Sequence, residues 1–475
     1  MTQQYSLKKL DWVLVGCYLF LIIFGWMNIY ASSSSDLDAG FVLKSKYGMH
    51  LIWMGTAMLI ATTILFILPS RIYAAFAWWL YIIVAVLLLA VVFVGVEVNG
   101  SKSWLAFGSL RLQPAEFSKI STSLVLAAVM SKYEYRFNNR RDMLRTIGIL
   151  LLPMLFILLE KETGSALVYL GFLLVFYREG MTGWIIVLGM ISILLFILTL
   201  VLSPFASMLI LVGIIALIAS SKTRNPLITM AIVGLCIAVA SFFPRLGRIE
   251  LLTEYFEQYG AELLFAAITV PVALVLAIRG WRRRQTVLRN MMLGYLCGVA
   301  LIFSVDFIFN DILQDHQRLR IESLLGLKDD PMGVGYNVHQ SKIAIGSGGL
   351  FGKGFLNGTQ TRFEFVPEQS TDFIFCTVGE EWGFLGTLAV IVVYLVLILR
   401  LLNTAEKRKD RFARIYGYCV ACCILMHVFI NISMTIGLMP VIGIPLPFLS
   451  YGGSSLWAFT ILLFIYVRLE MDDQI

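Results

Sequence analysis

The sequence predicts an all-α, polytopic integral membrane protein with about fourteen transmembrane helices and both termini in the cytoplasm. Of its 475 residues, 59% are hydrophobic and only 14% are charged, and the mean hydropathy is +0.84. Soluble domains usually carry roughly 25% charged and about 45–50% apolar residues. This composition excludes a soluble enzyme, a disordered chain and a nucleic-acid binder.

Fourteen apolar runs are long enough to be candidate spans, which need about 20 residues each. The first run follows Lys8 and Lys9 and lacks a clear small-residue cleavage site, so we interpret it as a membrane helix rather than a cleaved signal peptide. The runs cover residues 10–30, 49–68, 73–95, 116–131, 146–160, 163–178, 182–202, 206–220, 226–243, 262–279, 287–308, 373–401, 414–437 and 448–468.

The seven cysteines all fall inside apolar runs, where cysteine behaves as a small hydrophobe. Cys419 and Cys422 have C-x-x-C spacing, but no second pair or histidine completes a metal site. We therefore predict neither a disulfide framework nor a cysteine-bound metal.

The basic loops set the sidedness, because loops rich in lysine and arginine stay in the cytoplasm. With the N-terminus inside, all four strongly basic loops lie on the cytoplasmic side. These loops contain residues 136–145, 222–224, 279–289 and 407–414. The net charge of +7 therefore reflects the basic residues of the cytoplasmic loops.

The same sidedness places residues 97–115, 244–261 and 306–372 outside. The last segment is the richest in glycine and charge, and long loops on a rigid scaffold often carry function. Its glycines suit either close approach to a ligand or repeated turns.

Asp372 and Glu380 lie where this long loop meets the next apolar run. An apolar flank raises the pKa of a carboxylate, as a general base near neutral pH requires. Equally, Thr371 or Asp372 could be the N-cap of the following helix. Glu380 lies two turns further on and is either functional or paired with a nearby cation.

Two other external segments contain unusual residues. Glu116 and Lys119 lie one turn apart at the start of a span, where they bind a ligand or neutralise each other. Residues 439–455, which include Ser450, break a helix at the outer surface, and such backbone requires a protein-lined cavity. Together these segments predict an outward-facing pocket for an anionic ligand that carries hydroxyl groups.

Five strings in this chain resemble the SEDS family (shape, elongation, division and sporulation proteins), and its RodA branch more than its FtsW branch. They are QPAEFSK at 113–119, GYNVHQSKIAIGSGGLFGKG at 335–354, GTQTRFEFVPEQSTDFIF at 358–375, GEEWGFLG at 379–386 and PVIGIPLPFLSYGGSSL at 440–456. They occur in the family's order over roughly the first 180 and last 175 residues.

The resemblance implies a peptidoglycan glycosyltransferase of the bacterial inner membrane that polymerises lipid II outside the cytoplasm, for elongation and shape or for division. It implies a class B penicillin-binding protein as the partner and Asp372 as the catalytic base. The candidate supporting residues are Trp104, Glu116, Lys119, Glu368, Glu380 and Ser450, with Lys119, Lys342, Lys353 or Arg362 as cations for the leaving pyrophosphate. The resemblance specifies no cofactor; a divalent cation such as Mg2+ could share the task of holding the pyrophosphate, although no external carboxylate cluster requires one.

The chain departs from the family pattern in two places. The usual Gln-Pro-Asp-Leu-Gly-Thr string reads Glu-Lys-Glu-Thr-Gly-Ser at 160–165, and serine stands before Trp104 where a basic residue is common. Members usually have ten spans, so we expect about four extra helices. The predicted domains are residues 1–181 and 281–475 for the core and 182–280 for the inserted helices.

Two alternatives of other functional classes remain. A lipid II flippase should show repeats and a path lined on both sides of the membrane, whereas the candidate residues crowd onto the external side. A non-catalytic scaffold of the cell-wall machinery predicts that Asp372 is dispensable.

Overall fold

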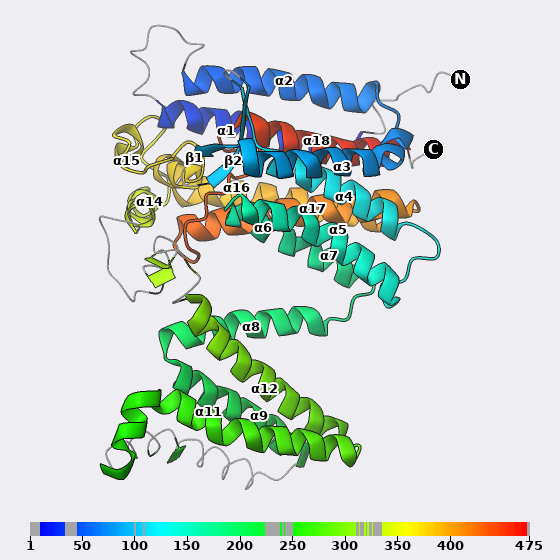
Figure 1. Ribbon diagram of the computed structural model, residues 1–475. Coiled ribbons are helices and arrows are strands. Elements are labelled where there is room, and N and C mark those ends of the chain that lie inside the picture. Colours follow the sequence, from blue (N-terminus) through cyan, green and yellow to red (C-terminus); the bar gives the residue numbers. More distant parts are fainter. Residues whose placement is uncertain are drawn as a thin grey trace. The chain divides into compact units, whose positions relative to one another are not determined.

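The computed structural model describes residues 10–33, 45–98, 101–107, 110–223, 250–309 and 335–472, with isolated positions between 238 and 325. It divides into two compact units (Figure 1). Unit 1 contains residues 1–182 and 329–475, and unit 2 contains residues 183–328. The chain passes from unit 1 to unit 2 after residue 182 and returns to unit 1 after residue 328. The predicted domain bounds, with an insertion at 182–280 into a ten-span core, stay predictions.

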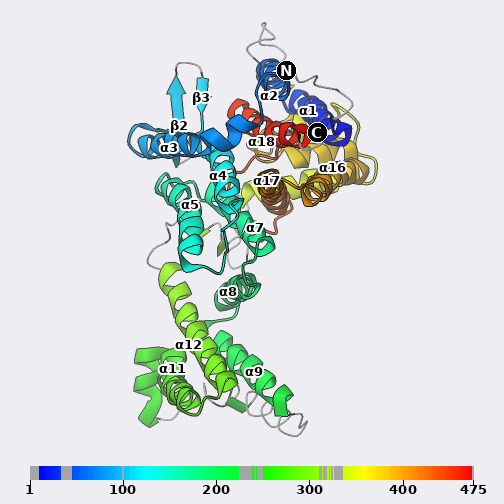
Figure 2. The same ribbon diagram turned by 90° about the vertical axis from the view of Figure 1, so that its right-hand side faces the viewer.

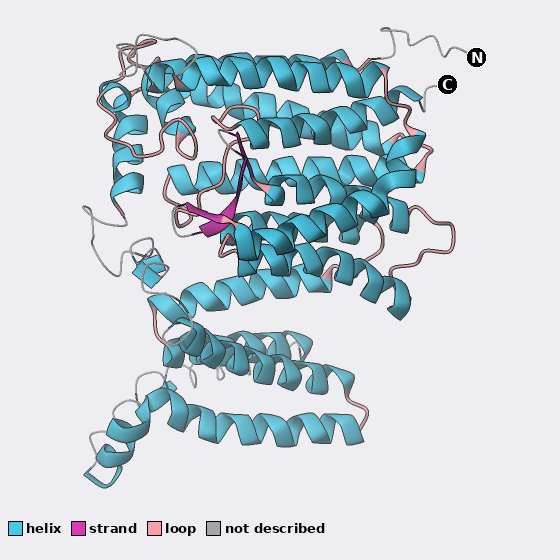
Figure 3. Ribbon diagram, turned by 45° about the horizontal axis from the view of Figure 1, so that its top comes forward, coloured by secondary structure: helices cyan, strands magenta, loops and turns pink. Residues whose placement is uncertain are grey.

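The helices of unit 1 are α1 (Trp12–Ser32), α2 (Lys46–Phe66), α3 (Arg71–Val94), α4 (Pro114–Met130), α5 (Arg140–Leu159), α6 (Thr163–Val168), η4 (Tyr169–Gly171), α7 (Phe172–Arg178), α14 (Tyr336–Ser347), α15 (Thr359–Arg362), α16 (Ile374–Glu406), α17 (Arg411–Thr435) and α18 (Gly453–Asp472). Unit 2 contains α8 (Trp184–Val201), α9 (Pro204–Thr223), α11 (Glu250–Arg282) and α12 (Thr286–Phe307). Helices make up most of the described chain, as Figure 3 shows.

Thirteen of the fourteen predicted apolar runs coincide with these helices, and most of the run at 226–243 lies outside the described residues. Among the described residues, ten helices are long and apolar enough to cross a membrane. The chain is therefore a multi-pass membrane protein. The total of fourteen spans, the sidedness of the termini and the external position of residues 306–372 stay predictions.

The fold is mostly helical, as predicted, and contains in addition one small antiparallel sheet. Strands β1 (Val96–Val98), β2 (Ser101–Phe107) and β3 (Leu110–Leu112) occupy the segment between α3 and α4. Leu105 pairs with Leu112 and Phe107 with Leu110, so β2 and β3 form a hairpin beside the helices (Figure 2). The apolar residues of β2 are consecutive, from Trp104 to Phe107, so the sequence lacks the alternation that marks a half-buried strand.

Local signals in the sequence explain where several helices begin. The carboxylates of Asp11 and Asp410 accept hydrogen bonds from the first free backbone N–H groups of α1 and α17. Pro114 occupies the first turn of α4, where its missing N–H costs nothing. Gly383, with φ of +65°, breaks α16 into two parts.

The centre of unit 1 is formed by α17 and α18, the most buried of the candidate spans. Helix α17 packs against α4, α7, α16 and α18, and α18 also packs against α2. Helices α3 and α5 expose many of their apolar side chains, as helices in contact with lipid do. The buried α17 therefore lies where its polar side chains can join several elements.

Part of the glycine-rich loop packs on α16. The hydroxyl of Ser341 in α14 donates to the carbonyl of Thr435, 2.9 Å away. A Cβ on Gly348 or Gly352 would lie 2.0 Å from a carbonyl oxygen of α16, Gly379 or Glu381 respectively. These glycines therefore permit close approach to a helix of the same chain.

Candidate active site

Asp372 lies two residues before the start of α16, and its side chain is half-buried. The N-cap of α16 is Phe373, with no side-chain capping bond, so the predicted capping alternative for Asp372 is wrong. Among the described residues, no hydrogen bond holds the Asp372 carboxylate. It is therefore available to a substrate.

The backbone around Asp372 is fixed by the helix break at residues 440–452. Asn431 of α17 donates from Nδ2 to the carbonyls of Asp372 (2.8 Å) and Ile444 (2.7 Å). Ser450 donates from Oγ to the carbonyl of Thr371 (2.6 Å) and accepts from the N–H of Leu446 (2.8 Å). Ser450 is buried, so its role in this structure is to hold the loop that carries Asp372.

The environment of Asp372 suits a base. Burial raises the pKa of this carboxyl to about 7, and the nearby carboxylate of Glu368 adds to the shift. A Cβ on Gly443, whose φ is +75°, would lie 3.4 Å from Oδ2 of Asp372, so a glycine keeps the space beside the carboxylate open. Glu368 is exposed and accepts from the hydroxyl of Thr371 (3.0 Å).

Glu116 and Lys119 form the predicted pair in α4, and a third residue joins them. The Nζ of Lys119 lies 2.8 Å from Oε2 of Glu116 and 2.7 Å from Nε2 of His427. It also lies 5.1 Å from the ring centre of Phe459. All three polar side chains are buried, so the mutual neutralisation considered from the sequence is realised.

His427 and Asn431 lie one turn apart on α17. Neither is among the site residues predicted from the sequence. The Nδ1 of His427 lies 3.3 Å from the carbonyl of Pro445, next to Ile444, which Asn431 binds. The two residues therefore attach the Lys119 cluster and the Asp372 backbone to one helix break. The sequence signal that could have identified them is a pair of polar side chains four residues apart in an apolar span.

The acidic string at 160–165 lies against the same helix break. A Cβ on Gly164 would lie 2.9 Å from side-chain atoms of Ile442 and Ile444. Glu162 accepts hydrogen bonds from Gln113 (2.8 Å) and Ser165, and burial raises the pKa of its carboxyl. Burial and the charge of Glu162 raise the pKa of Glu160 to about 8.

Glu380 and Lys353 form a separate, structural cluster. The buried carboxylate of Glu380 accepts from Nζ of Lys353 (2.7 Å) and from the backbone N–H groups of Gln360 (2.9 Å) and Thr361 (2.8 Å). It also accepts from the hydroxyls of Thr359 (3.2 Å) and Thr361 (2.7 Å). Glu380 thus anchors the short helix α15 to α16, as the ion-pair alternative anticipated.

The remaining predicted residues lie apart from these clusters. Lys342 in α14 and Arg362 in α15 are exposed. Neither side chain forms an ion pair with another described residue. Lys342 lies over Gly437, just beyond α17. Trp104 is half-buried in β2, opposite Val96. No described contact joins Trp104, Lys342 or Arg362 to Asp372.

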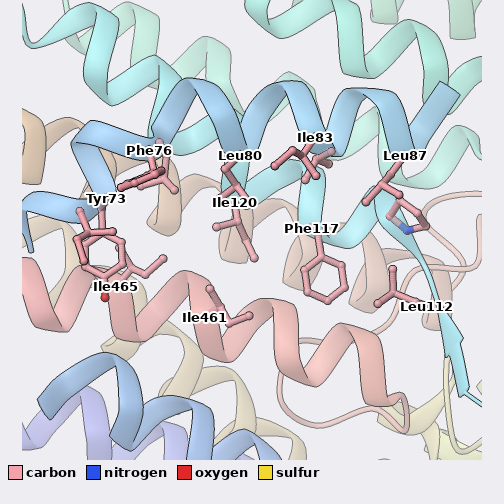
Figure 4. A pocket seen from close by; sticks show the side chains of 14 residues that line it. Tyr73, Phe76, Leu80, Ile83, Leu87, Leu112, Phe117, Ile120, Ile461 and Ile465 are labelled. Atoms are coloured by element: carbon pink, nitrogen blue, oxygen red, sulfur yellow. The ribbon is translucent and has the colours of Figure 1, made fainter. Parts of the chain in front are cut away.

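An apolar cavity of about 410 Å3 lies between α3, α4 and α18 (Figure 4). Its lining extends along α3 from Ile72 to Leu87, about 22 Å at the helical rise, and ends at Leu112 and Pro114. Pro114 is close in sequence to Glu116. The cavity is lined by Ile72, Tyr73, Phe76, Leu80, Ile83, Val84, Leu87, Leu112, Pro114, Phe117, Ile120, Leu124, Ile461 and Ile465.

Comparison with known proteins decides the family. The model of the cell cycle protein family FtsW/RodA/SpoVE matches residues 11–212 and 256–475. The chain belongs to this family. The peptidoglycan glycosyltransferase MrdB of Escherichia coli is 30% identical over 450 residues, which cover 94% of this chain and 90% of that protein. RodA of Treponema pallidum is 29% identical, covering 95% of both chains.

Solved structures show the same fold. A chain from a peptidoglycan synthase complex, studied for its coordination of polymerization and crosslinking, has a TM-score of 0.62 at 23% identity and 98% coverage of both chains. RodA of Thermus thermophilus has a TM-score of 0.52 at 20% identity, covering 98% of this chain and 97% of its own. The FtsW/RodA/SpoVE match leaves residues 213–255 uncovered, within unit 2.

Proposed function

We propose that this peptidoglycan glycosyltransferase polymerises lipid II at the outer face of the cytoplasmic membrane with Asp372 as its general base. The observation that carries the proposal is the half-buried Asp372 carboxylate, without a capping role and with a pKa of about 7. A base with a pKa near the working pH is both ionised and able to take a proton. The enzyme class itself follows from the family and its named relatives.

The reaction joins two lipid-linked sugars. The 4-hydroxyl of one N-acetylglucosamine attacks the anomeric carbon of a lipid-linked N-acetylmuramic acid. The new C1–O4 bond forms, the bond from C1 to the pyrophosphate oxygen breaks, and the proton of the hydroxyl passes to Asp372. General base catalysis of this kind contributes typically about 10²–10⁴ in rate.

Cations that reach the bound substrate would stabilise the departing pyrophosphate. Lys342 and Arg362 are exposed and without an ion pair among the described residues, so they are free to contact phosphate oxygens. Lys119 is buried and already bound to Glu116 and His427, so it acts through its charge and through the framework it holds. Lys353 is occupied by Glu380.

The apolar cavity beside α4 supports a lipid-linked substrate. Its lining consists of apolar and aromatic side chains, and it ends near the first turn of α4, which carries Glu116. A polyprenyl chain there would exchange contacts with lipid tails for packing against these side chains, because the lining is as apolar as the lipid. The cavity therefore offers a place for a polyprenyl tail.

The proposal includes a class B penicillin-binding protein as the partner. It also includes a divalent cation that binds together with the substrate. Among the described residues, no group of three or more histidine, cysteine, aspartate or glutamate side chains is arranged to hold a metal. Mg2+ is often held by one or two carboxylates together with substrate phosphates, so a cation would bind with the pyrophosphate. Loss of activity in chelator, restored by added Mg2+, would support this part, and unchanged activity would remove it.

The test of the activity is polymerisation of purified lipid II in detergent by the full-length protein, with and without its penicillin-binding partner. Glycan strands released by the wild type support the proposal. Absence of strands in both conditions, together with movement of lipid II across vesicles, would favour a flippase. Strands of equal yield from Asp372→Ala would retain the polymerase and remove Asp372 as its base.

A further inference from the structure

The turn between α11 and α12 of unit 2 carries an unusually high concentration of positive charge. It contains five arginines, 279, 282, 283, 284 and 289, and we call residues 279–289 the arginine turn. No aspartate or glutamate occurs between residues 263 and 305. Because the turn joins two candidate membrane spans, its charge lies next to a lipid surface.

The backbone of the arginine turn gathers these side chains at one point. The N–H of Gln285 bonds to the carbonyl of Gly280 (2.8 Å) and the N–H of Arg284 to that of Trp281 (3.2 Å), the pattern of a Schellman helix end. A Cβ on Gly280 would lie 2.9 Å from the N of Arg289, so α12 begins directly against the end of α11.

Arg284 occupies the position of this motif that normally requires glycine. Its φ is +54°, a left-handed conformation that glycine adopts without steric cost and other residues do not. The rule that basic residues stay in the cytoplasm would be met by the other four arginines with glycine at 284. Arginine at this position therefore adds a fifth positive charge to the turn at the cost of backbone strain.

The arginines have no acidic partners among the described residues, unlike those of another basic turn. Arg279 and residues 282–284 are exposed, and Arg289 bonds only to its neighbour Asn290. By contrast, Arg408 pairs with Glu470, and Arg411 and Arg414 pair with Glu179. The charge of the arginine turn is therefore available to an external anion.

The surroundings of the turn identify the anion. Trp281 is 71% exposed, and the guanidinium of Arg289 lies 5.7 Å from its ring centre. Exposed Ile278 and Val287 flank the turn on the two helices. Tryptophan is enriched at the level of lipid headgroups, so these residues place the arginines beside lipid phosphates, which guanidinium groups bind with two parallel hydrogen bonds.

We propose that the arginine turn is a binding site for the phosphate of anionic phospholipids in the cytoplasmic leaflet. The site is independent of the active site of unit 1 and of the reaction proposed for it. Clusters of basic residues just inside a membrane span attract anionic lipids.

The test is native mass spectrometry of the full-length protein released from membranes of equal dioleoyl phosphatidylglycerol and dioleoyl phosphatidylcholine. The wild type should retain phosphatidylglycerol preferentially. Replacing Arg279, Arg282, Arg283 and Arg284 by glutamine should reduce that retention by about fivefold for each arginine removed. The matched control replaces Arg136, Arg140, Arg141 and Arg145, a second basic turn that contains Asp142, and should change retention less.

Arg284→Gly separates binding from folding. Glycine fits the left-handed position better, so this variant should melt at the same or a higher temperature while retaining less phosphatidylglycerol. Equal retention by the wild type and the fourfold variant would overturn the proposal, as would an equal loss in the control variant. Unchanged lipid retention with arginine-dependent binding of polyglutamate would assign the turn to an acidic protein instead.

Discussion

Lys119 and His427, 308 positions apart in the sequence, meet in the interior of unit 1, where Nζ of the lysine lies 2.7 Å from Nε2 of the histidine. Because an ammonium group only donates, Nε2 must accept and Nδ1 carries the proton, directed at the carbonyl of Pro445. One chain of contacts therefore connects α4, α17 and the helix break that also holds the backbone of Asp372.

The Glu116–Lys119 pair can be tested by a double-mutant cycle. Lys119→Met leaves the buried Glu116 carboxylate without its cation and should lower the free energy of unfolding by about 3–5 kcal/mol, with loss of polymerisation. Glu116→Gln combined with Lys119→Met should recover most of the stability but not the activity. Recovery of both in the double variant would show that the pair only supports the fold.

His427 should act by positioning Lys119. His427→Leu removes the acceptor of the lysine, so kcat and kcat/KM should fall together with little change in KM, as expected when stabilisation exists only in the transition state. His427→Gln keeps an acceptor and should retain most of the activity. A large rise in KM at constant kcat in steady-state assays with lipid II would contradict this role.

The pH dependence should report the Asp372 carboxyl. Its pKa is raised to about 7, and the base acts when ionised, so kcat/KM should rise with pH up to about 7 and then level off. Glu368→Gln removes a like charge and should move the midpoint to lower pH. A midpoint unchanged by this variant would mean that burial alone sets the pKa.

The same shift has a consequence for stability. The raised pKa means that folded Asp372 binds its proton more tightly than the unfolded chain does. Between about pH 4 and pH 7 this group therefore makes the protein less stable as the pH rises. Asp372→Asn should weaken that decline in thermal melts across this range, and an identical pH profile for the variant would contradict the assignment.

Glu380 should prove structural. Glu380→Gln exchanges the carboxylate that receives Lys353 and the two backbone N–H groups of α15 for an amide with a single acceptor oxygen. Proteolysis at residues 353–362 should become faster, while the midpoint of the pH–rate profile stays unchanged. Lys353→Met is the matched control and should have the same effect to a smaller degree. A shifted midpoint would instead bring Glu380 into the reaction.

The helices were predictable because apolar runs of about 20 residues have few other uses. The β2–β3 hairpin was not, since Ser101–Phe107 is short and its apolar residues are consecutive instead of alternating with polar ones. Gly383 also escaped prediction: one glycine in an apolar run does not reveal that its φ is positive.

The candidate site was only half visible in the sequence. Asp372, Glu116 and Lys119 stand out as charges beside apolar runs, and the structure places all three around the same helix break. Their linkage depends on His427 and Asn431, whose partners are 308 and 59 positions away, and no local pattern encodes such contacts. Glu380 illustrates the opposite case, because a buried carboxylate looks functional until its five hydrogen bonds are known.

The most direct test of the account is the rate of glycan formation from lipid II by the wild type, Asp372→Asn and Asp372→Glu, at matched thermal stability and pH 8. Asparagine keeps the shape of aspartate but cannot take a proton, so we expect a loss of at least about a hundredfold. The glutamate variant keeps the carboxylate and should retain measurable activity with a pH profile of its own. Wild-type rates from Asp372→Asn would contradict the central claim.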